Sequence, residues 1–191
     1  MMNRRYSVSA LCVLVGLALT ACATDSNDPI KDRQYVSVVN SLSWTNPLTG
    51  KRDGVRTSWP VKSLQGHDET YPLAQIQQCD KAGGACAWGI MRAHRAVGQV
   101  AYVAAGVAVD LTLAIDIDRH QEVRLPGFNA AMAIPADVLA LRYKKELRQN
   151  FTLPYGKVQH MDLDYGISFD LCALRYDAGG RALDVCEIPY I

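Results

Sequence analysis

Two long segments of the chain alternate between apolar and polar residues, and this period of two constrains the fold more than any other feature. The first is DLTLAIDID, residues 110–118, and the second is HMDLDYGISFDL, residues 160–171. Successive side chains of a strand point to opposite faces, so this pattern indicates strands with one buried face. The side chains predicted to be buried are Leu111, Leu113, Ile115 and Ile117 in the first segment, and Met161, Leu163, Tyr165, Ile167, Phe169 and Leu171 in the second.

Further strands are expected elsewhere. A first strand is predicted at Val36, Val38, Leu42 and Trp44, closed by the turn-rich sequence TNPLTGKRDG. The valine-rich segment from Val97 to Val109 predicts a buried strand, with Gly106 at a bulge or a bend. Many strands separated by Gly, Pro and Asn turns predict an all-β or mainly β fold, either an antiparallel sandwich or a small barrel.

One segment carries a helical pattern. In PADVLALRYKKELRQNF, Pro135 to Phe151, Val138, Leu139, Arg142, Tyr143 and Leu147 have helical spacing, and Pro135 suits a first turn. The same residues also allow two strands, Val138 to Tyr143 and Leu147 to Leu153. We expect one short helix near residues 135–150.

The N-terminus has the composition of an export signal. Arg4 and Arg5 precede an almost entirely apolar or small run from Val8 to Ala21, and no charge occurs between Arg5 and Asp25. This run is shorter than the roughly 20 residues that a helix needs to cross a bilayer core. We therefore expect it to be cleaved after export.

The end of this run, Leu19-Thr20-Ala21-Cys22, resembles the lipobox of bacterial lipoprotein precursors. The resemblance implies a cleaved signal at residues 1–21 and a covalent lipid on Cys22, which anchors the chain because each buried methylene adds about 0.8 kcal/mol. Ala23, in place of an aspartate, implies the periplasmic face of the outer membrane. The alternative is an ordinary signal peptide with a coincidental cysteine.

Two parts are expected after Cys22. Residues 22–33 are polar and predict a lipidated flexible tether, and residues 34–191 predict a single β-rich periplasmic domain. Loss of residues 1–21 removes two of the 20 basic residues and leaves all 19 acidic ones, so the remaining chain is close to neutral. This balance argues against a nucleic-acid partner.

Four cysteines remain after Cys12 leaves with the signal and Cys22 takes the lipid. An oxidising compartment favours disulfides, and three pairings are open in principle. Cys79 and Cys86 are equidistant from the turn at Ala82-Gly83, and Cys172 and Cys186 are equidistant from the loop 178–180. Opposed residues of a hairpin lie close enough to bridge, so we predict two hairpin disulfides, Cys79–Cys86 and Cys172–Cys186.

Acidic and histidine side chains form two rows of common strand parity. The first contains Asp116, Asp118, His120 and Glu122, and the second contains His160, Asp162 and Asp164. If the strands were neighbours, the carboxylates could converge on calcium, which prefers oxygen ligands. The alternative is that both rows are solvated faces of amphipathic strands.

Candidate binding residues lie in the irregular segment Thr57 to Leu73, which contains Trp59, His67 and Tyr71. Long irregular segments on a rigid sheet often carry binding sites, and aromatic side chains are frequent at protein interfaces. The alternative is that Trp59 and Tyr71 only cover one end of the sandwich.

The sequence contains no GxSxG, HExxH, P-loop or GxGxxG motif. Together these features predict a non-catalytic, lipid-anchored protein that binds another envelope or secreted protein, as an inhibitor, immunity protein or assembly factor, and needs no cofactor. A calcium or small-ligand binder and an envelope hydrolase remain as alternatives. The hydrolase would need a cleft that holds a histidine and a carboxylate.

Overall fold

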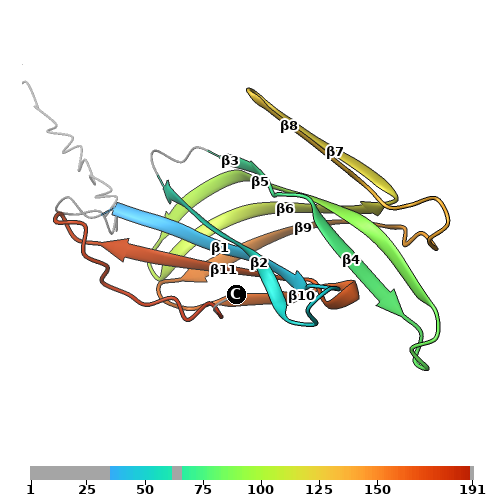
Figure 1. Ribbon diagram of the computed structural model, residues 1–191. Helices are drawn as coiled ribbons and strands as arrows, with labels where there is room; N and C mark the ends of the chain where they lie inside the picture. The colour runs from blue at the N-terminus through green and yellow to red at the C-terminus, as the bar shows by residue number, and fades with distance from the viewer. Residues whose placement is uncertain (1–34, 62–65, 190–191) are drawn as a thin grey trace, which may run out of the picture.

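Two antiparallel sheets face each other in the computed structural model, which describes residues 35–61 and 66–189 (Figure 1). Sheet A has the order β10-β11-β1-β2, with bounds Gln159–Asp162, Ser168–Tyr176, Tyr35–Thr45 and Arg52–Val61. Sheet B has the order β3-β5-β6-β9, with bounds His67–Thr70, Cys86–Val103, Gly106–Asp118 and Tyr143–Pro154. Strand β4, Ala74–Cys79, also pairs with β5. The predicted mainly β, antiparallel fold is confirmed.

A separate hairpin projects beside sheet B. It consists of β7, His120–Leu125, and β8, Phe128–Ala133, which pair only with each other within the described residues. Figure 1 shows this hairpin standing away from the two sheets. We call residues 120–133 the arm.

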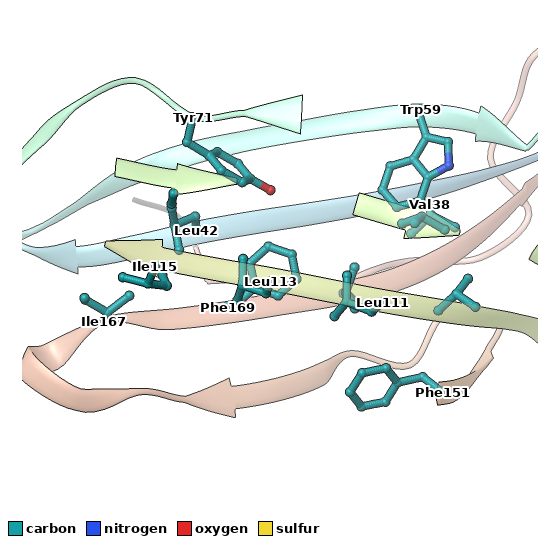
Figure 2. Packing of buried hydrophobic residues seen from close by; sticks show 14 of the residues in the cluster. Val38, Leu42, Trp59, Tyr71, Leu111, Leu113, Ile115, Phe151, Ile167 and Phe169 are labelled. Atoms are coloured by element: carbon teal, nitrogen blue, oxygen red, sulfur yellow. The ribbon is translucent and has the colours of Figure 1, made fainter. Parts of the chain in front are cut away.

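The core lies between sheets A and B, as the alternating pattern predicts. Leu111, Leu113, Ile115 and Ile117 are all buried and belong to one cluster with Leu42 and Phe169 of sheet A. Figure 2 shows aliphatic and aromatic side chains from both sheets filling this space. Each fully buried side chain of this size stabilises the fold by about 1.5–3 kcal/mol.

The segment at residues 160–171 is two strands, so the prediction of one long strand is wrong. Strand β10 ends at Asp162, a 3-10 turn spans Asp164–Gly166, and β11 begins at Ser168. Tyr165 and Gly166 both have positive φ, of 60° and 68°. Met161 pairs with Phe169, so the reversal keeps the apolar residues on one face and leaves the alternation intact.

The segment from Val97 to Val109 is also a hairpin instead of the single predicted strand. Strand β5 reverses at residues 104–105, and Gly106 begins β6 opposite Val103. A Cβ at Gly106 would lie 2.0 Å from the carbonyl oxygen of Leu153, so only glycine fits this close approach to β9.

The helix expected near residues 135–150 is wrong, because residues 143–154 form β9. This strand pairs with β6 along its whole length, from Tyr143 opposite Ile117 to Pro154 opposite Gly106. Charged side chains on its outer face are exposed, whereas Phe151 and Leu153 are buried in the core. Pairing with β6 therefore outweighs the helical spacing of the apolar residues.

Both predicted disulfides are confirmed. Cys79 and Cys86 are directly opposed in the β4–β5 pair. The second hairpin forms only at its turn, where Asp177 donates its backbone N–H to the Arg181 carbonyl over 2.9 Å and Tyr176 bridges to Ala182. Leu183 still donates its backbone N–H to the Arg175 carbonyl over 2.9 Å, and residues 184–189 form no strand.

The Cys172–Cys186 bridge therefore ties the C-terminal segment to sheet A. Cys172, Cys186, Val39, Leu174 and Ile188 form a second, smaller apolar cluster. On the side of β11 away from β1, β10 pairs with residues 168–171 and Tyr155 bridges to Ala173, so residues 184–189 cannot continue the pairing along β11.

Candidate functional site

The tip of the arm is a tight turn that its sequence favours. Leu125 pairs with Phe128 across the two-residue turn Pro126-Gly127, and Gly127 has φ of 76°. Proline fixes φ near −65° at the first turn position, and glycine accepts positive φ at the second. These two residues therefore favour a sharp reversal at the tip.

One face of the arm is largely apolar. The strand register puts Gln121, Val123, Leu125, Phe128, Ala130 and Met132 on this face. Gln121 and Val123 are buried against the body of the protein. The exposed fractions of Leu125, Phe128 and Met132 are 43%, 56% and 38%. The apolar face of the arm is therefore only partly covered.

The root of the arm is fixed by hydrogen bonds to sheet B and the following loop. Gln121 Nε2 donates to Asp116 Oδ1 over 3.2 Å. The backbone N–H of Ile134 donates to the Arg119 carbonyl over 2.9 Å, and Arg119 Nη2 donates to the Val138 carbonyl over 2.7 Å. These bonds hold both ends of the hairpin while its tip projects.

An apolar hollow of about 280 Å³ lies between the arm and the junction of β3 and β4. Its walls are Tyr71, Pro72 and Leu73 on one side, and Leu125, Phe128 and Met132 on the other. The exposed arm residues therefore face an unfilled space instead of a packed surface.

A second, more polar hollow of about 380 Å³ lies between β7 and the outer face of sheet B. Its lining includes Arg92, which pairs with Asp116 at 3.2 Å, and Arg124, which pairs with Glu122 at 2.8 Å. Thr70 and Val123 line both hollows. We call the two hollows together the arm groove, which has an apolar wall and a charged floor.

The predicted binding residues Trp59, His67 and Tyr71 are brought together, but inside the protein. Trp59 is 3% exposed and Tyr71 is 1% exposed. The Trp59 and His67 rings stack with centroids 5.3 Å apart. Trp59 and Tyr71 are therefore largely buried, although Tyr71 also lines the apolar hollow beside the arm.

The centre of this cluster is Arg95, which is completely buried. Its Nη2 donates to Glu69 Oε2 over 2.7 Å and to His67 Nδ1 over 2.8 Å. Its guanidinium also lies 4.0 Å from the centre of the Trp59 ring. Burial, followed by the charge of Arg95, lowers the pKa of His67.

A chain of hydrogen bonds extends this cluster from sheet B to sheet A. Thr57 Oγ1 donates to Glu69 Oε2 over 2.8 Å, and Asn40 Nδ2 donates to Thr57 Oγ1 over 2.9 Å. Tyr71 donates its hydroxyl to Asn40 Oδ1, and burial raises the pKa of Tyr71. The cluster thus joins the two sheets where edge strands β2 and β3 meet.

Three buried N–H donors of the cluster lack a hydrogen-bond partner among the described residues: Trp59 Nε1, Arg95 Nε and Arg95 Nη1. These atoms have almost no accessible surface. The cluster therefore has a structural role, which is to join the two sheets at their seam.

The two acidic rows predicted as a calcium site lie on different elements. Asp116 and Asp118 are on β6, and His120 and Glu122 are on β7. His160 and Asp162 are on β10 of sheet A, and Asp164 is in the following 3-10 turn. The rows are not neighbours, and the described residues contain no group of three or more acidic, His or Cys side chains placed to hold a metal ion.

Most of these carboxylates have basic or hydroxyl partners instead. Asp118 Oδ1 lies 3.3 Å from Arg142 Nε. Asp164 Oδ2 accepts from the Tyr143 hydroxyl over 2.6 Å and from Lys145 Nζ over 3.4 Å. The Tyr143 hydrogen bond, followed by Lys145, lowers the pKa of Asp164.

His160 lies between two carboxylates on the outer face of sheet A. Its Nδ1 is 2.6 Å from Oδ1 of the buried Asp170, and its Nε2 is 3.0 Å from Asp162 Oδ1. The Asp170 contact raises the pKa of His160. Both ring nitrogens of His160 therefore have a carboxylate partner in this arrangement.

The sequence interpretation missed the arm entirely. Pro126-Gly127 between apolar residues is a recognisable turn signal, and FNAAMA at residues 128–133 contains no charge. Cys22 and the signal and tether at residues 1–33 lie outside the described residues. Within the part of the chain that the structure describes, no helix is long and apolar enough to span a bilayer.

Comparison with known proteins adds no assignment: no protein-family model, curated protein or solved structure matches this chain.

Proposed function

We propose that this chain is a non-catalytic lipoprotein, anchored through Cys22 at the periplasmic face of the outer membrane, which binds another envelope or secreted protein through the arm groove. The partner would be a protein that it inhibits or helps to assemble. The anchor rests on the lipobox-like sequence at residues 19–22.

The partly uncovered apolar face of the arm carries this proposal. Phe128 at the tip is 56% exposed, and Leu125 and Met132 beside it expose more than a third of their surface. Three large apolar side chains next to an unfilled apolar hollow form a patch of the kind that marks protein interaction sites. A partner that enters the groove would remove this surface from water.

The shape of the groove favours a polypeptide ligand. Its apolar wall and charged floor would suit a segment with apolar side chains on one face and polar side chains on the other. The floor presents both signs of charge, because Arg92 and Arg124 lie beside Asp116 and Glu122. A strongly acidic or basic partner would therefore gain little net attraction there.

The two disulfides fit the proposed compartment. Disulfides persist in the oxidising periplasm and are rare in the cytosol. The Cys79–Cys86 bridge closes the β4–β5 hairpin, and the Cys172–Cys186 bridge holds the C-terminal segment. The fold would thus resist opening at the membrane surface.

Site-specific photocrosslinking in intact cells tests the proposal. A photoreactive side chain at Phe128 or Met132 should yield a specific crosslink to a protein other than a second copy of this chain, and one at Leu48 should not. Leu48 is the matched control because it is 78% exposed and lies outside the arm groove. Equal crosslinking at Phe128 and Leu48 would overturn the binding site.

The anchor needs its own measurement. Mass spectrometry of the mature N-terminal peptide should show Cys22 as the first residue with an added acyl mass. The Cys22→Ser variant should lose this mass and its membrane association. An unmodified Cys22 in the mature protein would refute the anchor but leave the arm groove untouched.

A further inference from the structure

Strand β8 is an edge strand without the features that normally prevent edge pairing. Its sequence FNAAMA has no charge and no proline, and within the described residues only β7 pairs with it. Charged side chains, proline and short length are the usual protection of an exposed edge. Two large apolar side chains, Phe128 and Met132, are exposed on the same strand.

The other edge strands of the described chain differ from β8. Strand β2 carries Arg52, Asp53, Arg56 and Pro60, and β9 carries Lys144, Lys145, Glu146 and Arg148. Strands β3 and β10 are only four residues long and contain acidic residues. Strand β4 is also uncharged, but it exposes no large apolar side chain. Only β8 therefore combines an uncharged edge with exposed apolar surface.

The turn defines which backbone groups of β8 face outward. In a hairpin with a two-residue turn, the closing pair exchanges backbone hydrogen bonds, and here that pair is Leu125 and Phe128. Phe128, Ala130 and Met132 thus direct their backbone groups toward β7. Asn129, Ala131 and Ala133 direct theirs away from it, and these positions can pair with another strand.

We propose that β8 pairs antiparallel with β8 of a second copy of this chain, which joins two arms into one four-stranded sheet. The register places Asn129 opposite Ala131 of the second copy, Phe128 opposite Met132 and Ala130 opposite Ala130 on the two-fold axis. No charges oppose each other in this arrangement, and the sulfur of Met132 contacts the aromatic ring of Phe128. A second copy is the occupant because the strand is complementary to itself.

The size of the contact sets its strength. Each copy contributes a six-residue strand, compared with the 20–30 residues on each side of a standard stable interface. The dimer is therefore weak and depends on concentration in solution. It needs no other protein, so it goes beyond the proposed function and can be tested separately from it.

Sedimentation velocity of the full chain in mild detergent tests the pairing. The average mass should rise from monomer to dimer with concentration. The double substitution Asn129→Lys, Ala131→Lys places lysine opposite lysine twice and should raise the dissociation constant about tenfold or more. Both positions are exposed, but the lysine at position 129 would lie opposite Arg124 of β7, so a circular dichroism spectrum is the control for folding.

A matched variant tests the register. Asn129→Glu with Ala131→Lys places glutamate opposite lysine in the proposed register and should keep or strengthen the dimer, and within the arm it also sets these side chains opposite Arg124 and Glu122 of β7. In the alternative register that pairs Ala131 with itself, the same variant would place lysine opposite lysine. A dimer as weak as that of the double-lysine variant would overturn the proposed register.

Disulfide trapping gives an independent readout. Ala130→Cys should form a covalent dimer on a non-reducing gel, because a non-hydrogen-bonded pair on the two-fold axis brings the Cβ atoms close. Leu48→Cys should not. A chain that stays monomeric at every concentration and yields no Ala130→Cys dimer would refute the proposal.

Discussion

Nη2 of Arg95 lies 2.7 Å from Oε2 of Glu69, and the arginine side chain has no exposed surface. This ion pair stands where β3 and β5 meet the hydrogen-bonded chain from sheet A. Removing one member of a buried pair leaves the other charge uncompensated, which usually costs more than the pair itself contributes.

Glu69→Gln should therefore lower the free energy of unfolding by about 2–3 kcal/mol. Glutamine keeps the size of the side chain and can still accept hydrogen bonds, so the loss reports mainly on charge. Adding Arg95→Met should recover a large part of the loss, because no buried charge then remains. Urea unfolding of the variants measures these changes. A Glu69→Gln variant as stable as the unmodified chain would contradict the structural importance of the pair.

His160 predicts a pH dependence of stability. Its folded pKa is raised by Asp170, so its stabilising contribution is fully present below the unfolded pKa of about 6.5. This contribution is lost as the pH rises through the folded pKa. His160→Gln should consequently destabilise the protein more at acidic than at alkaline pH. An NMR titration that puts the His160 pKa at or below 6.5 would refute this account.

The two disulfides should contribute unequally to the free energy of unfolding. Replacing Cys172 and Cys186 by alanine should cost about 3 kcal/mol from chain entropy alone, and also weaken the small cluster with Val39 and Ile188. The Cys79–Cys86 bridge closes a shorter loop with a sequence separation of 7 instead of 14, so its removal should cost less. Thermal unfolding of the two double variants should preserve this order, and the reverse order would count against it.

Substitutions of the exposed arm residues should leave the stability of the fold unchanged. Phe128→Ser and Met132→Ser change exposed side chains and should alter the free energy of unfolding by less than about 0.5 kcal/mol. Val123→Ser on the same face should cost more, because Val123 is buried. If the three variants were equally destabilised, the apolar face would be a structural contact instead of a free surface.

Much of the fold follows from local patterns. The strand period predicted the buried face from Leu111 to Ile117, and the symmetry of cysteines around glycine turns predicted both disulfides. The same period did not reveal the turn at residues 163–167. Residues that pair across this hairpin, such as Met161 and Phe169, are both odd-numbered, so the alternation of apolar and polar residues continues through the turn as it would along one strand. At Tyr143 to Pro154, long-range pairing with β6 decided between two locally reasonable structures.

The candidate site was harder to predict because it depends on distances between elements. Arg95 follows His94 in a segment whose local sequence pattern is amphipathic. Only the tertiary contacts of Arg95 with Glu69 and Trp59 explain its burial. The exposure of Phe128 and Met132 depends on how far the arm stands from Tyr71 and Leu73. No spacing within residues 120–133 encodes that separation.

The most direct test of the proposed function is the affinity for the protein that crosslinks to the arm. Phe128→Asp should weaken binding at least about tenfold, because it places a charge in the apolar wall of the arm groove. Leu48→Asp, an equally drastic change at another exposed apolar residue, should leave binding unchanged. Equal affinity of the Phe128→Asp variant and the unmodified chain would contradict the assignment of the arm groove as the binding site.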